Sequence, residues 1–441
     1  MSEMSEINNG QEIVEKHDVL FSQPLNIFLS KPYNTTFIET RLDVVWGIPK
    51  DAYSDVYSFI RPGNVVGLLK TSDAKISCDM SVRDQHGALA AGSNIIPPPL
   101  PLRTLFKTKE LKINESLVTP SGNSSYLASY ISFLTRETPT MYKDSPEINL
   151  CYPDTAGHMD AINGDNPQAR LRHAAVNNNT SHIIDTIDCP GFDEGGSEVY
   201  VPSAFKIDLK FTRANMLTVM TGGPHADLAV GNAKLMLNDL KITIPVFKPK
   251  DQLAAALNKM FITHDKDAKY YTTVFRTVVS LVGAGRRKIR ENDIFNGSVP
   301  VRLFILYSLQ NNYNGTIGTS CFNFPWHNFQ NIDVSVNSVS VGTIKNQKEA
   351  YSQLRDVLNR KYSEMPITFN QFINGYGVIA FDLTSNHDTH LAVLPARASG
   401  VVNCEIDFSQ NTAAGSLIFI GEFRNEIKVG LKKPARLLYD I

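Results

Sequence analysis

The segment FKIDLKFT, residues 205–212, alternates apolar and polar side chains without a break. A period of two residues is typical of a β-strand with one buried face, because successive side chains of a strand point to opposite sides. The same period returns in LKITIPV, residues 240–246, and in VNCEIDF, residues 402–408. The runs at residues 303–306 and 417–420 are apolar on both faces, as expected of central strands covered on both sides. The sequence therefore predicts a protein built mainly of β-strands.

Turn signals separate the strand candidates, including Asn-Gly pairs at residues 296–297, 314–315 and 374–375 and Gly-Gly-Pro at 222–224. The second half of the chain contains about eight strand candidates, at residues 271–282, 299–309, 331–336, 339–344, 377–383, 400–408, 415–423 and 425–430. Eight short strands in a domain of this size predict a sandwich of two four-stranded sheets, the jelly-roll count. The first half carries a similar set with longer loops.

Helical periodicity is limited to three short stretches: one with Tyr126, Tyr130, Phe133 and Leu134 on a face, one with Tyr351, Leu354 and Leu358, and one after Pro249. The third separates the two strand-dense regions. We therefore predict a flexible arm at residues 1–20, a first β domain at 21–246, a helical linker at 247–267 and a second β domain at 268–441. A long insertion, rich in Asn, Asp, Pro and Gly, is expected around residues 138–180. One helix embedded in each half suggests a duplicated architecture.

The composition excludes several classes of protein. The 441 residues are 42% hydrophobic and 20% charged, which is normal for a globular chain. Lys and Arg number 43 against 44 Asp and Glu, so wholesale polyanion binding is not indicated. No apolar run approaches the ~18 residues of a membrane span. The acidic, polar first residues lack the features of a signal peptide, and we expect a soluble protein that is not exported.

The cysteines give no sign of a metal or redox site. The five cysteines (Cys78, Cys151, Cys189, Cys321 and Cys404) are widely scattered, so no CxxC pair exists. Cys404 lies on an apolar strand face and is expected to act as a small hydrophobic side chain. We expect a reducing compartment for synthesis.

Motifs that carry chemistry are mostly missing. The sequence has no HExxH, GxSxG or GxxxxGK[ST] motif. Gly283-Ala284-Gly285 is interpreted as a turn, His387 and His390 as part of a polar loop with metal ligation as the alternative, and Asp193-Glu194 as a solvated turn with ion binding as the alternative. No catalytic, cofactor-binding or metal-binding residue is assigned.

Three groups of residues leave alternatives open. Glu405 and Asp407 stand on one face of a predicted strand, roughly 6.6 Å apart by strand rise, which lies between the carboxylate separations of retaining and inverting glycosidases. An outward polar strand face is the plainer interpretation. The basic run Arg286, Arg287, Lys288 and Arg290 is either a solvated loop or a contact for nucleic acid, a partner or an import receptor. The aromatic residues Phe322, Phe324, Trp326 and Phe329 either pack in a core or subunit interface or stack on bases or sugars.

Ordered motifs in both halves resemble a known family. In the first half, LRTLFKTKELKINE at residues 102–115 precedes NSSYLASYISFL at 123–134. In the second half, FNGS at 295–298, FNF at 322–324, NGYG at 374–377 leading into FDLT at 381–384, and GEFRNEI at 421–427 follow in order. Together they resemble the double jelly-roll major capsid proteins of the Polinton/Maverick and adintovirus-like group, in the lineage of adenovirus hexons and virophage capsids. The insertion around 138–180 and the arm match no part of that pattern.

The resemblance implies an all-β fold of two consecutive eight-stranded jelly rolls with a few short helices. It implies a structural protein without enzymatic activity, cofactor or small-molecule substrate, and without a specific nucleic acid partner. Three copies would form a pseudo-hexameric capsomer that tiles an icosahedral shell together with neighbouring capsomers, penton proteins and minor or cement proteins. The chain would be made in the host cytoplasm, assembled in the nucleus or a viral factory, and located in the virion.

Two other functions remain open on the sequence alone. A carbohydrate-binding or carbohydrate-cleaving β-sandwich protein would use an exposed aromatic platform or the pair Glu405 and Asp407. A nucleic-acid-binding structural protein would use the basic run at residues 286–290.

Overall fold

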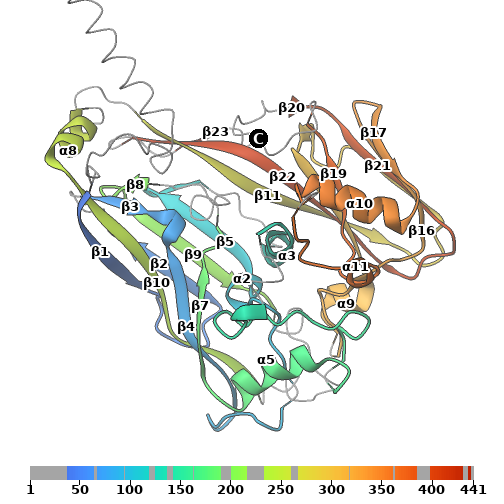
Figure 1. Ribbon diagram of the computed structural model, residues 1–441, viewed down its shortest axis with the longest axis horizontal. Helices are drawn as coiled ribbons and strands as arrows, with labels where there is room; N and C mark the ends of the chain where they lie inside the picture. Colours follow the sequence, from blue (N-terminus) through green and yellow to red (C-terminus); the bar gives the residue numbers. More distant parts are fainter. Residues whose placement is uncertain are drawn as a thin grey trace, which may run out of the picture.

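The computed structural model describes residues 37–63, 67–93, 95–118, 125–136, 143–161, 163–189, 200–215, 233–259, 267–316, 318–360, 363–384, 398–430 and 436–438. Figure 1 shows two strand-rich halves placed side by side along the longest axis. The predicted arm at residues 1–20 lies outside the described residues. Among the helices that are described, none is both long and apolar enough to cross a membrane.

The first half is a sandwich of two antiparallel sheets. The larger sheet has the order β7-β4-β10-β3-β8, and β1 also pairs with β10. Its strands are β1 (Phe37–Trp46), β3 (Leu68–Lys70), β4 (Lys75–Asp84), β7 (Ser181–Thr186), β8 (Tyr200–Pro202) and β10 (Ala233–Pro249). The smaller sheet, β2-β9-β5-β6, consists of β2 (Val56–Arg61), β5 (Phe106–Ile113), β6 (Ser116–Leu117) and β9 (Ile207–Arg213). The alternating segment at residues 205–212 supplies most of β9, with Ile207, Leu209 and Phe211 buried.

The second half is built in the same way. Its larger sheet has the order β11-β22-β14-β19, and β23 also pairs with β22. These strands are β11 (Ala268–Val282), β14 (Arg302–Leu309), β19 (Ile379–Asp382), β22 (Gly415–Val429) and β23 (Arg436–Leu438). The smaller sheet, β12-β21-β16-β17, consists of β12 (Lys288–Glu291), β16 (Phe329–Val336), β17 (Val339–Ile344) and β21 (Val402–Phe408). Two short pairs complete the half: β13 (Ser298–Val299) with β20 (Ala398–Ser399), and β15 (Phe324–Pro325) with β18 (Asn374–Gly375).

The main strands of both halves are connected in one common order. With the short strands left aside, the larger sheets read β1-β10-β4-β7 and β11-β22-β14-β19, which is the first, eighth, third and sixth strand of each half. The smaller sheets, β2-β9-β5-β6 and β12-β21-β16-β17, hold the second, seventh, fourth and fifth. This is one eight-stranded jelly-roll order used twice. It confirms the predicted fold class and the duplication that the embedded helices suggested.

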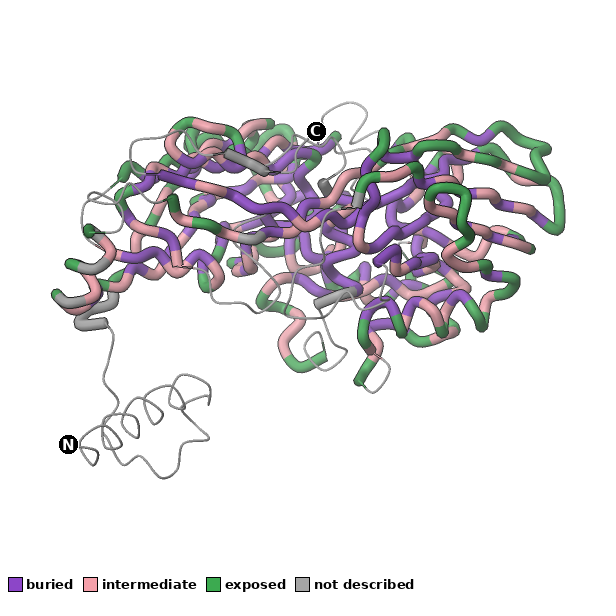
Figure 2. Tube along the Cα trace, turned by 90° about the horizontal axis from the view of Figure 1, so that it is seen from above, coloured by how far each residue is buried: buried purple, intermediate pink, exposed green. Residues whose placement is uncertain are grey.

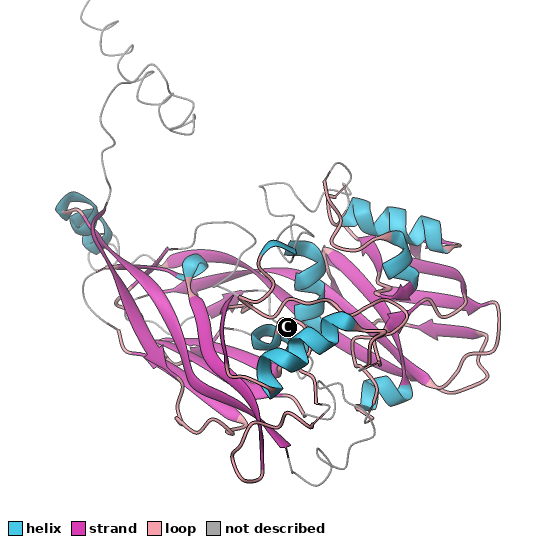
Figure 3. Cartoon of the chain, turned by 60° about the horizontal axis from the view of Figure 1, so that its bottom comes forward, coloured by secondary structure: helices cyan, strands magenta, loops and turns pink. Residues whose placement is uncertain are grey.

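The helices are few and short. The two predicted inside the halves are present as α3 (Ser125–Arg136) and α10 (Gln347–Val357), each after the fifth main strand of its half. Figure 1 shows α3 between the two halves, while α10 packs on β19 at the flank of the second half. In Figure 3 the short cyan helices lie beside and between the magenta strands of the two halves. The other helices within the described residues are η2 (Thr71–Asp73), α2 (Pro101–Thr104), α5 (Pro167–Asn177), α8 (Asp251–Asn258), α9 (Gln310–Asn314) and α11 (Phe369–Ile373).

Buried residues run through both halves, as the purple segments of the Cα trace in Figure 2 show. In the first half, the ring of Phe211 lies 5.5 Å from that of Phe59 and 5.2 Å from that of Phe106. In the second half, Phe304 and Phe419 are fully buried on neighbouring strands of the larger sheet. These inner faces hold the sheets together, because burial of apolar area is the main favourable term in folding.

Three details differ from the sequence-based expectation. Residues 247–249 of the predicted linker continue β10, because β1 supplies pairing partners as far as Pro249. The linker's helix is α8, and residues 260–266 lie outside the described part.

The two strand candidates at 415–423 and 425–430 are the single strand β22, paired with β11 along its whole length. Within 138–180, the helix α5 begins after the N-cap Asn166, whose side chain accepts a hydrogen bond from the Ala169 amide; weak apolar periodicity hid this helix. The domain division itself stays a prediction.

Candidate functional site

The two halves meet along a seam of aromatic rings around α3. The ring of Tyr130 on α3 lies 5.2 Å from Phe324 and 6.4 Å from Tyr376, both in the second half. The ring of Tyr126 lies 6.2 Å from that of Phe322. All five side chains are buried. The seam is therefore a packed interface, and aromatic pairs of this kind stabilise an interface beyond their buried area.

A small apolar cavity of about 30 Å³ lies in this seam. Tyr130, Phe322 and Tyr376 line it, and Asp154 is the one acidic residue on its wall. The Tyr130 hydroxyl is buried without a hydrogen-bond partner, and burial raises its pKa well above the ordinary value. A cavity of this size holds about two waters at most, so it is a packing defect of the seam and offers no room for a sugar or nucleotide.

The predicted insertion crosses the seam and binds the second half. Asp160 accepts hydrogen bonds from the Ser320 amide at 2.6 Å, from Asn323 Nδ2 at 2.9 Å and from Asn312 Nδ2 at 3.3 Å. Burial nevertheless raises the pKa of Asp160. The Tyr376 hydroxyl donates to the Asp154 carbonyl at 2.7 Å. The insertion acts as a brace between the two halves and is not a free surface loop.

Arg172 on α5 holds the brace together from inside. Its side chain is fully buried. It donates from Nη2 to Asp154 Oδ1 at 2.6 Å, from Nε to the Pro97 carbonyl at 2.8 Å and from Nη1 to the Tyr152 carbonyl. One guanidinium thus joins three segments: α5, the connection before α2, and the segment with Tyr152 and Asp154, whose Asp154 carbonyl accepts from Tyr376. Arg suits this role because its donors form a rigid planar fork.

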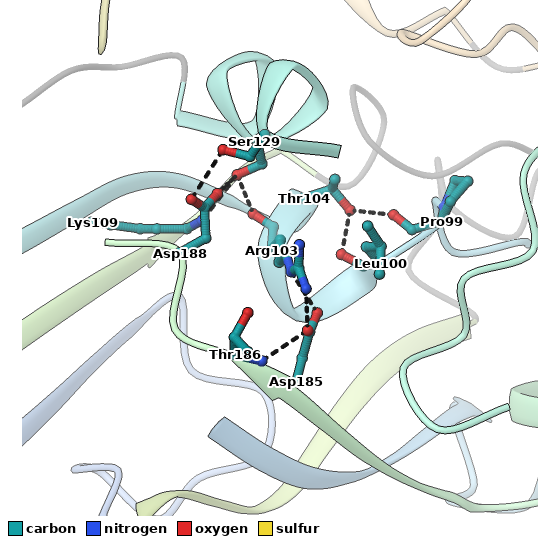
Figure 4. Close-up of polar contacts among 10 residues, drawn as sticks. Pro99, Leu100, Arg103, Thr104, Lys109, Ser129, Asp185, Thr186 and Asp188 are labelled. Atoms are coloured by element: carbon teal, nitrogen blue, oxygen red, sulfur yellow. Dashed lines mark hydrogen bonds and ion pairs between the residues drawn. The ribbon is translucent and has the colours of Figure 1, made fainter. Parts of the chain in front are cut away.

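A second buried ionic cluster lies between α3 and the strands of the first half, and Figure 4 shows it. Arg103 pairs with both oxygens of Asp185, at 2.9 Å from Nε and 2.6 Å from Nη2. Lys109 donates to Ser129 Oγ at 2.9 Å and lies 3.4 Å from Asp188 Oδ2. Burial lowers the pKa of Lys109, while the Asp188 carboxylate opposes that shift. Two cations face two carboxylates, so the cluster is matched in charge and positions α3 over the sheet.

The predicted carboxylate pair and the predicted basic run face each other. Lys288 and Arg290 lie on β12 of the smaller sheet, where Lys288 is the register partner of Asp407 and Arg290 that of Glu405. The other two residues of the run, Arg286 and Arg287, lie in the connection just before β12. Arg290 and Lys288 both form ion pairs with Glu405, and Lys288 Nζ lies 3.6 Å from Asp407 Oδ1. Hydrogen bonds from Lys288 and Arg290 lower the pKa of Glu405. The general acid of a glycosidase is a carboxyl group with a raised pKa that lies in a cleft. Glu405 has a lowered pKa and lies on an open strand face, so the pair does not have the features of a glycosidase site.

The other residues singled out in the sequence are an aromatic group, a glycine turn, two pairs of polar residues and the cysteines. Phe322, Phe324 and Phe329 are buried and Trp326 packs against the core, which confirms core packing for the aromatic group. Gly283–Gly285 forms a turn closed by the Gly285 amide on the Thr412 carbonyl at 2.8 Å. His387, His390, Asp193 and Glu194 lie outside the described residues. All five cysteines are buried free thiols.

No group of His, Cys, Asp and Glu residues in the described ranges is arranged to hold a metal ion. His387 and His390, for which the sequence leaves metal ligation as an alternative, lie outside those ranges.

One surface feature escaped the sequence analysis. On β1, Leu42, Val44 and Trp46 point outward and are 63%, 48% and 40% exposed. The inward side of the strand carries Asp43, which accepts from Arg61 Nε at 3.0 Å, and Val45. The usual orientation of a half-buried strand is therefore reversed, with apolar side chains facing water. Contiguous outward apolar side chains of this kind mark contact surfaces.

Comparisons with known proteins agree with this architecture. The sequence matches no protein family model and no curated protein. The fold is similar to a chain in the cryo-EM structure of the Sputnik virophage, with a TM-score of 0.65, 10% identity and coverage of 95% of this chain and 92% of that one. It is similar to a chain of the PBCV-1 virus capsid, with a TM-score of 0.58, 11% identity and coverage of 94% and 100%.

A third similar structure is the mavirus major capsid protein, with a TM-score of 0.50, 11% identity and coverage of 95% of both chains. At such low identity the likeness concerns the fold. The matches extend over nearly the whole chain, so both sandwiches and their connection take part in it. The chain has the double jelly-roll fold of viral major capsid proteins.

Proposed function

We propose that this chain is a major capsid protein that trimerises into pseudo-hexameric capsomers and tiles an icosahedral viral shell. The observation that carries the proposal is the duplicated jelly-roll order within one chain, matched over 94–95% of its length by virophage and capsid structures. Two similar sandwiches per chain give three copies a six-lobed outline, and such an outline packs efficiently in a shell.

The seam supports this role mechanically. A shell subunit has to keep a fixed angle between its two sandwiches, because neighbouring capsomers contact both of them. Aromatic packing around Tyr130, the Asp160 hydrogen bonds and the buried Arg172 all bridge or brace the two halves. Packed interiors resist deformation, so the pair behaves as one building block.

The proposal extends to partners and location. The chain would contact neighbouring capsomers, penton proteins and minor or cement proteins, reside in the virion, and perform no catalysis. Assembly in the host nucleus or a viral factory, and membership of the Polinton-like group, belong to the same proposal. The domains would be an arm at 1–20, jelly rolls at 21–246 and 268–441, and the linker predicted at 247–267, of which residues 247–249 continue β10. The matched charges on β12 and β21 support a structural surface in place of a carbohydrate-cleaving one.

Light scattering of the purified chain tests the proposal. We expect a particle of about three times the 49.0 kDa chain mass at micromolar concentration. A chain that stays monomeric under these conditions contradicts it.

A further inference from the structure

The seam inside the chain is a head-to-tail contact. It joins the helix of the first sandwich, α3, to the first strand of the second sandwich, β11, and to the aromatic connections beside it. Two unlike surfaces meet there: the helix flank of one jelly roll and the first-strand flank of the next. A contact between unlike surfaces can be repeated from one unit to the next, and it closes into a ring when the rotation permits.

The duplicated topology leaves one copy of each surface unused. The counterpart of α3 in the second sandwich is α10, and the counterpart of β11 in the first is β1. The described side chains of α3 at Tyr126–Leu134 are buried or half-buried, whereas α10 carries an exposed row, Lys348, Ser352 and Asp356. On β1, the exposed row is the apolar stripe Leu42, Val44 and Trp46.

We propose that the apolar stripe on β1 of one copy docks against the α10 flank of a second copy, so that the seam within the chain recurs between chains. The inference rests on the proposed capsid function and adds the surfaces through which copies join. Three chains joined this way give six sandwiches in one ring, with intrachain and interchain seams in alternation. The occupant of the stripe is thus another copy of this same chain.

The chemistry of the two surfaces is complementary at the rim. Lys50 and Lys241 lie over the Trp46 ring, at 5.5 Å and 5.1 Å from its centroid. The α10 flank offers the carboxylates of Glu349 and Asp356, both exposed. Burial of the stripe between these charges resembles the apolar centre and polar rim of stable interfaces.

Site-directed crosslinking tests the geometry. The five native cysteines are buried, so Val44→Cys combined with Ser352→Cys supplies the accessible thiols. With a short bis-maleimide crosslinker, the double variant should give covalent dimers and trimers on a denaturing gel. Each single variant should give none, because position 44 meets position 352 and not its own copy. The proposal is overturned if either single variant forms crosslinked dimers. It is also overturned if the double variant is trimeric but forms no crosslinked species.

Charge insertion supplies an independent test. Val44→Glu with Trp46→Glu should convert the trimer into folded monomers in light scattering, with circular dichroism unchanged. The matched control is Leu281→Glu, a 72% exposed residue near the far end of β11, which should leave the trimer intact. A trimeric stripe variant refutes the docking surface while leaving the capsid proposal standing. A monomeric wild-type chain refutes both.

Discussion

Several buried cations in the first half of the chain lie in close ion pairs. Arg103 meets Asp185, Lys109 meets Asp188 and Arg172 meets Asp154, each within the packed interior. A buried ion pair is weak evidence for stability, since its desolvation offsets the attraction. Removing one partner has a large effect, because it leaves the other charge buried alone. These pairs therefore fix the positions of α3 and α5 more than they add net stability.

Arg172→Met should destabilise the protein by about 3–5 kcal/mol, because Asp154 would be left buried without its cation. Urea denaturation followed by tryptophan fluorescence measures the change. Arg170→Met on the same helix is the matched control, since Arg170 is exposed, and its effect should stay within about 0.5 kcal/mol. Equal unfolding midpoints for the two variants contradict this account of the brace.

His327 makes stability depend on pH. Its ring lies 4.6 Å from that of Tyr307, its Nε2 is buried without a partner, and burial lowers its pKa from 6.5 to about 4. Between these values the unfolded chain binds a proton that the folded chain does not. The contribution of the neutral, buried His327 ring to the free energy of unfolding is therefore complete above pH 6.5. It falls as the pH drops and is lost by about pH 4.

The expected contribution of this histidine is on the order of 2 kcal/mol. His327→Phe keeps a ring in place and removes the titration. The stability difference between wild type and variant, measured by denaturation from pH 7 to pH 4, should change in favour of the variant as the pH falls. A difference that stays constant over that range excludes this role for His327.

At the scale of elements, the helix α3 decides how the two halves fit. Its outward side chains fill the seam, yet the Tyr130 hydroxyl finds no partner there. An unsatisfied buried hydroxyl lowers stability, whereas its ring contributes packing. Tyr130→Phe should therefore be neutral or stabilising by up to about 1 kcal/mol. Tyr130→Ala should cost about 3–5 kcal/mol. Thermal unfolding of both variants measures this, and a clear loss of stability in Tyr130→Phe would show that the hydroxyl has a partner after all.

The elements also show what sequence can and cannot predict. Strands such as β9 and β21 were predictable, because one face meets the core and the period of two follows directly. The brace was not, since Asp160 and Arg172 act through contacts with residues far away in the sequence. The sequence of β1 also alternates, and a period of two would place the apolar side chains of Leu42 and Val44 on the inner face. In the structure these two side chains face outward, and Asp43 lies on the inner face, where it accepts a hydrogen bond from Arg61 Nε. The apolar face turned to water is a feature only the structure reveals.

At the scale of the whole molecule, one jelly-roll order is used twice and the two copies are locked by a head-to-tail seam. The sequence predicted the strand-rich halves and their duplication. It could not predict which flank of one sandwich meets which flank of the other, because that choice depends on the packing of α3 against residues some 200 positions later. This geometry is the physical basis of the proposed role as a shell unit.

Electron microscopy of the purified chain measures the assembled geometry directly. The account predicts particles with three-fold symmetry and a six-lobed outline, each chain contributing two lobes. Isolated two-lobed particles at micromolar concentration, or pairs related by a two-fold axis, would contradict it.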